Sequence, residues 1–261
     1  VDDLSVSESL ESARLVHSLL PVLLAGTLGA SALVIGDPAP LGRGFSALPD
    51  AAAEARAVAG VLSAGGCGVT ELIHAEGRAI MAALHQDAWR ILHLAGHGVH
   101  EYVVPTTTPA DGGSGTRKVS GMVIGDGWFL TPGDVEQMRY VPELVFINCC
   151  HLGNTGGNDA AGSPDLNRLA ANLATQFIRM GVRAVVAAGW AVDDAAARCF
   201  AETLYGSLLD GRGFGDAVRL AREATWTRHP KVNTWGAYQC YGDPDYRLDP
   251  TGPARRDSAP P

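Results

Sequence analysis

The chain has 261 residues, a formal net charge of −8 and a hydrophobic fraction of 46%. That fraction is ordinary for a globular protein and allows a large core. Because Lys and Arg form no block along the chain, direct nucleic-acid binding is excluded as the expected main function. The acidic balance is compatible with a basic substrate.

The chain contains 5 cysteines, an odd number, and no CxxC pair. This pattern predicts neither a disulfide framework nor a zinc site. We therefore expect a protein of the reducing cytoplasm that uses no metal and no cofactor.

One long stretch, residues 18–35, is apolar and uncharged, but Pro21, Gly26 and Gly29 interrupt it and no basic region precedes it. A signal peptide has such a basic region, and a membrane span is longer and less interrupted. We expect an amphipathic helix, a turn and a strand here, and no membrane segment.

Short apolar runs alternate with helical patterns along the chain, as in βαβ units with a parallel sheet. The predicted helices cover residues 1–25, 51–64, 76–86, 195–209 and 214–227, and two more begin at Thr131 and Ser163. The predicted strands cover residues 32–35, 69–73, 89–94, 121–124, 128–130, 144–148, 184–188 and 238–241. The sequence thus predicts a single α/β domain, residues 1–249, in which residues 1–30 form a helical lead-in.

Three segments have the composition of loops or linkers. Residues 104–118 and 153–162 are rich in Gly, Thr, Asn and Asp and have no periodicity, so we expect flexible loops. The Pro-rich residues 250–261 are expected to be a flexible tail or a linker to other parts of a longer chain.

Two of the predicted strands run directly into chemically reactive residues. The strand at 144–148 is followed by Cys149 and Cys150, and the strand at 89–94 is followed by His97. The carboxyl ends of neighbouring parallel strands meet at one edge of a sheet, where ligands bind. A nearby imidazole activates a thiol and later protonates the leaving amine. The pattern predicts a cysteine peptidase with Cys150 as nucleophile and His97 as general base and acid.

Such a reaction also needs donors for the developing oxyanion. Gly98 has no side chain to obstruct its N–H, and the N–H of Cys150 is the expected second donor. His97 precedes Cys150 by about fifty residues, which agrees with the caspase pattern, although the local caspase signature around the cysteine is absent.

Five segments resemble, in the same order, parts of the CHAT domain, a caspase-like and separase-related cysteine peptidase domain of many bacterial multidomain proteins. They lie between about Ala32 and Asp245 and read HLAGHG, SGMVIGDG, LVFINCCHLG, GVRAVVAAGWAVDD and HPKVNTWGAYQCYGDP. Aligned on Gly153, the family's nucleophile falls on Cys150 and its histidine falls on His97. His151 and Leu152 replace the family's usual Glu-Thr pair.

The resemblance implies a caspase-hemoglobinase-like fold, with a mostly parallel central sheet and helices on both faces, and endopeptidase activity without a metal. Related separases have a similar Trp-x-Val-x-Asp segment, in which the last Asp helps to receive a basic residue before the scissile bond. That role falls on Asp194, with Asp193 as the alternative. Trp190 is expected either to line the substrate groove or to pack, and Asp126 or Asp159 to contribute from loops.

A free peptidase would endanger a cytoplasm. We therefore expect a domain that stays latent until fused or partner sensor domains activate it, in a bacterial signalling or defence system. Its expected partners are a protein or peptide substrate and these regulatory domains, not nucleic acid and not a membrane.

Other interpretations stay open. His100 and His151 are rivals for the base, whereas His93 and Cys149 are expected to be packed in the core. We expect structural roles for Cys67, Cys199 and Cys240. Two alternative functions are a catalytically inactive module for partner binding or scaffolding, and Cys/His acyl-transfer or amidase chemistry on a small substrate.

Overall fold

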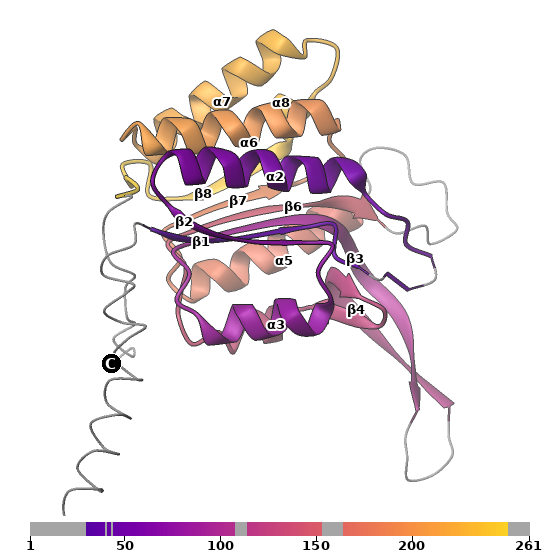
Figure 1. The fold of residues 1–261 in the computed structure, drawn as a ribbon. Helices are drawn as coiled ribbons and strands as arrows, with labels where there is room; N and C mark the ends of the chain where they lie inside the picture. Colours follow the sequence, from indigo (N-terminus) through magenta and orange to yellow (C-terminus); the bar gives the residue numbers. More distant parts are fainter. Residues whose placement is uncertain (1–29, 40, 43, 108–113, 153–163, 250–261) are drawn as a thin grey trace, which may run out of the picture.

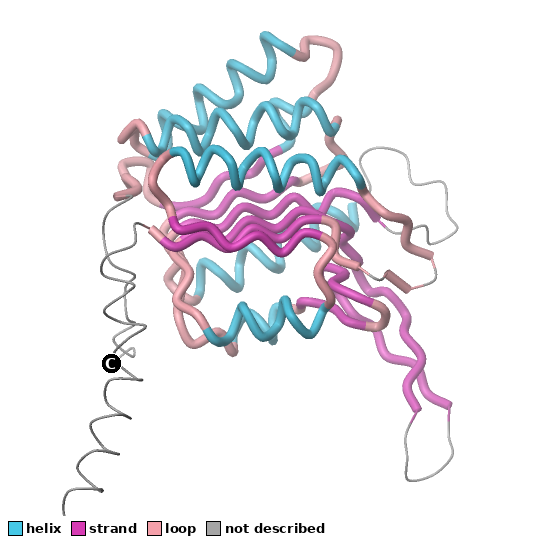
Figure 2. Tube along the Cα trace, in the orientation of Figure 1, coloured by secondary structure: helices cyan, strands magenta, loops and turns pink. Residues whose placement is uncertain are grey.

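The computed structural model describes residues 30–39, 41–42, 44–107, 114–152 and 164–249. The predicted helix at 1–25, the loop at 153–162 and the tail from residue 250 lie outside these ranges. Within them, helices cover both faces of one central sheet, giving three layers (Figures 1 and 2). The predicted α/β class is confirmed.

The described part of the chain forms an 8-stranded sheet with the order β2-β1-β3-β6-β7-β8, and β4 and β5 extend it beside β3. The strands are β1 (Ser31–Gly36), β2 (Gly68–Ile73), β3 (Ile91–Thr107), β4 (Ser114–Gly125), β5 (Trp128–Leu130), β6 (Leu144–Leu152), β7 (Ala184–Ala188) and β8 (Tyr238–Gly242). The five strands from β2 to β7 in this order pair in parallel. Only β4, β5 and β8 pair antiparallel in this part of the chain, so the sheet is mostly parallel as predicted.

Two hydrophobic layers hold the helices on the sheet. The helices are α2 (Pro49–Ala64), α3 (Gly77–Gln86), α4 (Pro132–Glu136), α5 (Pro164–Arg179), α6 (Asp194–Leu209), α7 (Phe214–Arg228) and α8 (Thr234–Ala237). Because side chains alternate along a strand, Ala32 and Val34 pack toward α2, α6 and α7, whereas Leu33 and Ile35 pack toward α3 and α5. None of the helices in the described ranges is long and apolar enough to cross a lipid bilayer.

Local sequence signals predict most helix ends to within one or two residues. Thr131 caps α4, since its hydroxyl accepts from the Asp134 N–H while the Asp134 carboxylate accepts from the Thr131 N–H. Along α5, Leu173 and Phe177 are buried, whereas Ile178 is 42% exposed.

The prediction of a loop at 104–118 is wrong at both ends of this segment, which belong to strands. β3 continues to Thr107 and pairs with β4 in a long antiparallel hairpin, which projects from the sheet in Figure 1. Cross-strand pairing supports this extended backbone although the segment lacks alternation of polar and apolar residues. Only residues 108–113 of the predicted loop stay outside the described strands.

Candidate active site

The pairing of β3 with β6 brings the two predicted catalytic segments together. The Cα of His97 pairs with that of His151, the residue after Cys150. His97 lies inside β3 and Cys150 lies inside β6. The prediction that each strand ends before its reactive residue is therefore wrong. Ala95 pairs with Asn148, so β6 holds one extra residue before His151, a bulge of the kind that re-aims side chains beside active sites. The side chains of Cys150 and His151 lie outside the described set.

The imidazole of His97 is held by the segment that joins β1 to α2. Its Nε2 lies 2.7 Å from the carbonyl oxygen of Ser46, and the Phe45 ring lies 5.4 Å from the imidazole, centroid to centroid. A carbonyl only accepts hydrogen bonds, so Nε2 carries a proton and Nδ1 is the basic nitrogen of the neutral ring. The Ser46 carbonyl thus selects the tautomer that can accept a proton at Nδ1.

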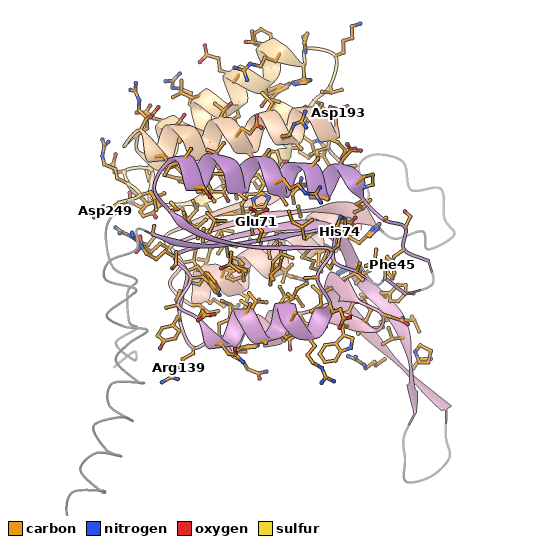
Figure 3. The ribbon with its side chains drawn as sticks, in the orientation of Figure 1. Phe45, Glu71, His74, Arg139, Asp193 and Asp249 are labelled. Atoms are coloured by element: carbon orange, nitrogen blue, oxygen red, sulfur yellow. The ribbon has the colours of Figure 1, made fainter. Side chains whose placement is uncertain are left out.

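Asp37 fixes the start of this segment. It is buried at 2% exposure, has a positive φ of 44° and accepts a 2.9 Å hydrogen bond from the Leu48 N–H. His74 Nδ1 lies 3.3 Å from the other carboxylate oxygen. In Figure 3, Phe45 and His74 lie at the end of the sheet where β3 leaves it, and Asp249 lies at the opposite end. The Gly-Asp-Pro turn marks this segment in the sequence, but no pattern there identifies Phe45 or Ser46 as neighbours of His97.

Gly98 is needed for close approach between β3 and β6. A Cβ at this position would collide with Leu169 Cδ2 and would lie 2.6 Å from the carbonyl oxygen of Cys149. The peptide group between Cys149 and Cys150 therefore lies directly against Gly98. The assignment of the Gly98 and Cys150 N–H groups as oxyanion donors stays a prediction.

The remaining histidine and cysteine side chains have other environments. His100 Nδ1 lies 3.3 Å from the Ser120 hydroxyl, farther along β3. Cys149 is 6% exposed and packs in the core on the α5 side of the sheet. Burial raises the pKa of the Cys67 thiol and raises that of Cys240 to about 11. Since the thiolate is the nucleophile, a raised pKa makes these two thiols less reactive at neutral pH than an ordinary cysteine.

A buried polar network lies beneath the site, between α2, β3 and β6. The Glu54 carboxylate accepts a 2.7 Å hydrogen bond from Asn148 Nδ2, and it lies 3.2 Å from His93 Nε2 without hydrogen-bond geometry. His93 Nδ1 lies 3.3 Å from the Tyr205 hydroxyl, whose pKa is raised by burial and by the charge of Glu54. The network ties both β3 and β6 to α2. The sequence did not identify Glu54, because a Glu side chain in a helix is usually exposed to solvent.

The predicted substrate-binding residues fall into two groups. Trp190, Asp193 and Asp194 follow β7, which borders β6 on the edge away from β3. Asp193 caps α6 by accepting from the Ala196 N–H at 3.0 Å, and Asp194 is the first residue of that helix. The Trp190 indole N–H is buried with no acceptor among the described residues. Asp126 lies in the β4–β5 turn, beyond the other edge of β3. Asp126 and Asp194 therefore lie on opposite sides of β3.

Asp159 lies outside the described residues. Within the described ranges, no group of three His, Cys, Asp or Glu side chains is arranged to hold a metal ion. The side chains available at this edge of the sheet are therefore an imidazole, carboxylates and an indole beside the strand of Cys150.

Solved structures with a similar fold include two of gingipain R, an Arg-specific cysteine proteinase. One is the proteinase itself, with 13% identity, a TM-score of 0.49 and coverage of 85% of this chain and 47% of the other. The second is a complex of the pro- and mature domains of RgpB from Porphyromonas gingivalis, with 15% identity, a TM-score of 0.50 and coverage of 86% and 49%. This chain thus spans about half the length of the solved proteins it matches.

At these identities the second likeness shows the fold alone, a caspase-like α/β fold with a mostly parallel sheet. No curated protein sequence matches the chain. The family model of the CHAT domain matches residues 5–243, nearly the whole chain. The chain therefore belongs to the CHAT domain family and has a cysteine peptidase-like fold.

Proposed function

We propose that this domain is a cysteine endopeptidase in which Cys150 is the nucleophile and His97 transfers the proton. The observation that carries the proposal is the parallel pairing of β3 with β6, which sets His97 opposite the residue that follows Cys150. The hydrogen bond from His97 Nε2 to Ser46 adds support, because it gives Nδ1 the role of base.

The reaction follows from these groups. Nδ1 of His97 takes the proton of the Cys150 thiol, and the thiolate attacks the carbonyl carbon of the scissile bond. The N–H groups of Gly98 and Cys150 stabilise the oxyanion of the tetrahedral intermediate. The imidazolium then gives its proton to the leaving amine, and a thioester to the acyl part remains. Water, deprotonated by His97, hydrolyses that thioester and restores the thiol.

Recognition of a basic residue before the scissile bond is the second part of the proposal. The loop after β7 borders the nucleophile strand on the side away from His97, where the acyl part of a substrate would lie. Asp194 is the first candidate for the acidic contact because it aligns with the last Asp of the separase Trp-x-Val-x-Asp segment. Asp193, whose carboxylate caps α6, is the alternative. A desolvated carboxylate that pairs with Arg or Lys discriminates strongly against neutral side chains.

Latency is the third part of the proposal. His97 is only 4% exposed and lies beneath Phe45 and Ser46, so a substrate chain needs a displacement of nearby segments to reach it. Fused or partner regulatory domains, in a bacterial signalling or defence system, are the proposed source of that displacement.

The specificity is tested by replacing Asp194 with Asn and comparing peptides that carry Arg, Lys, Leu or Asp before the scissile bond. We expect the wild type to prefer Arg or Lys and Asp194→Asn to lower that preference by about ten-fold or more, as the loss of one charge pair predicts. Asp193→Asn is the matched control, since an amide can still cap the helix, and it should keep the preference. Equal losses in both variants would assign the effect to the start of α6 as a whole and remove Asp194 from this role.

A further inference from the structure

A pocket of about 430 Å³ lies between the segment that joins β1 to α2 and the β3–β4 hairpin. Its lining includes three aromatic residues, Phe45, Tyr102 and Phe129, and two of opposite charge, Arg117 and Asp126. The three aromatic residues are half-buried, so each has surface left to offer a ligand. Aromatic and charged side chains thus share its walls, and its volume lies in the range of ligand-binding pockets.

A continuous series of rings connects this pocket to His97. The centroid separations are 5.4 Å from His97 to Phe45, 5.5 Å from Phe45 to Tyr102 and 6.0 Å from Tyr102 to Phe129. These tilted pairs lie within the usual range for interacting aromatic side chains. The pocket therefore begins one ring away from the proposed acid–base group, and another aromatic side chain can join the series.

The sheet order decides which part of a substrate reaches the pocket. Gly98 pairs with Leu152 of β6 at one edge of β3 and with Met122 of β4 at the other edge. The pocket lies on the β4 side, whereas Cys150 lies in β6. During peptide cleavage the acyl part becomes attached to the thiol, and the amine part departs beside the imidazole that protonates it. The chain that follows the scissile bond thus leaves His97 toward the pocket.

We infer that this aromatic pocket binds an aromatic side chain of the protein substrate within the first three residues after the scissile bond. The inference rests on the proposed peptidase function. Two ring separations, 5.4 and 5.5 Å, lead from His97 to Tyr102. Three extended residues at roughly 3.3–3.6 Å each nearly span this path, and the length of an aromatic side chain covers the remainder. Arg117 and Asp126 supply charged groups for the substrate's peptide N–H and C=O groups at the rim.

The first test uses peptides that share all residues before the scissile bond and carry Phe or Gly at the first, second or third position after it. We expect the wild type to show a kcat/KM about ten-fold or more higher for Phe at one of these positions. Phe129→Ala should lower that ratio toward one. Trp128→Ala should keep it, because Trp128 is the neighbour in β5, is 47% exposed and lies outside the lining.

The second test measures binding without turnover. A Phe-containing tripeptide amide, which represents the leaving fragment, is titrated calorimetrically into Cys150→Ala protein and into the same protein with Phe129→Ala or Trp128→Ala added. Binding that is lost only with Phe129→Ala supports the inference, whether or not the wild type cleaves peptides. Cleavage without preference at any of the three positions, together with no binding, overturns the inference and leaves the peptidase intact. Absence of cleavage and of thiol activation, with binding retained, overturns the peptidase and leaves an aromatic-binding pocket.

Discussion

Replacing Cys150 with Ala is expected to lower peptide hydrolysis by at least about 10⁴-fold, because Cys67, Cys149 and Cys199 are buried and Cys240 lies in β8, so none of these thiols can replace it. The measurement is kcat/KM on a peptide mixture, with the folded state checked by circular dichroism. The loss should appear in kcat, since the thiol acts in the chemical steps rather than in substrate binding.

Cys149→Ala is the matched control for this loss. Cys149 packs in the core at 6% exposure, so its truncation removes a few apolar contacts and leaves Cys150, the proposed nucleophile, unchanged. We expect activity within a few-fold of the wild type and a free energy of unfolding lower by about 1 kcal/mol. Activity that disappears in Cys149→Ala and persists in Cys150→Ala would move the nucleophile by one residue and contradict the alignment.

The largest expected effect on stability comes from Glu143, which precedes β6. Its carboxylate accepts from Arg90 Nε at 2.9 Å and from the Tyr246 hydroxyl at 3.2 Å, and both charged side chains are buried. Glu143→Ala deprives the buried guanidinium of its carboxylate, so we expect the free energy of unfolding to fall by about 3–5 kcal/mol. Urea denaturation followed by circular dichroism measures this difference.

Two further variants separate the buried pair from general sensitivity to mutation. Glu223→Ala removes the carboxylate of an exposed pair with Arg219, 3.2 Å apart, and should change stability by less than about 0.5 kcal/mol. The double variant Arg90→Met with Glu143→Leu should recover most of the loss, because apolar side chains of similar size replace a desolvated pair well. A loss in Glu143→Ala no greater than in Glu223→Ala would show that the Arg90–Glu143 pair does not join β3 and β6 energetically.

The sequence was sufficient where a signal is local. Pro49 at the start of α2, Gly66 after its end and the run of β7 are each marked by residue type alone, and the structure has these elements where they were predicted. The approach of His97 to the strand of Cys150 was also predictable, because parallel strands align their carboxyl ends.

Contacts that depend on distant parts of the chain were not predictable in the same way. The extension of β3 and β4 arises from their pairing with each other, and the hairpin residues carry no alternation that marks strands. Ser46 contacts His97 through a backbone carbonyl, which any residue type can supply. From the sequence, Glu54 is expected to be a solvent-exposed helix residue, but in the fold its carboxylate accepts a hydrogen bond from Asn148.

If Cys150 and His97 act as one unit, the rate at which Cys150 is alkylated depends on His97. Iodoacetamide would be reacted at pH 6 with the wild type and with His97→Ala, and the modified cysteine identified by mass spectrometry. Because the imidazole takes the thiol proton, we expect fast labelling of Cys150 in the wild type and labelling at least about ten-fold slower in His97→Ala. Equal rates in the two proteins, or labelling of another cysteine first, would contradict the joint action of Cys150 and His97.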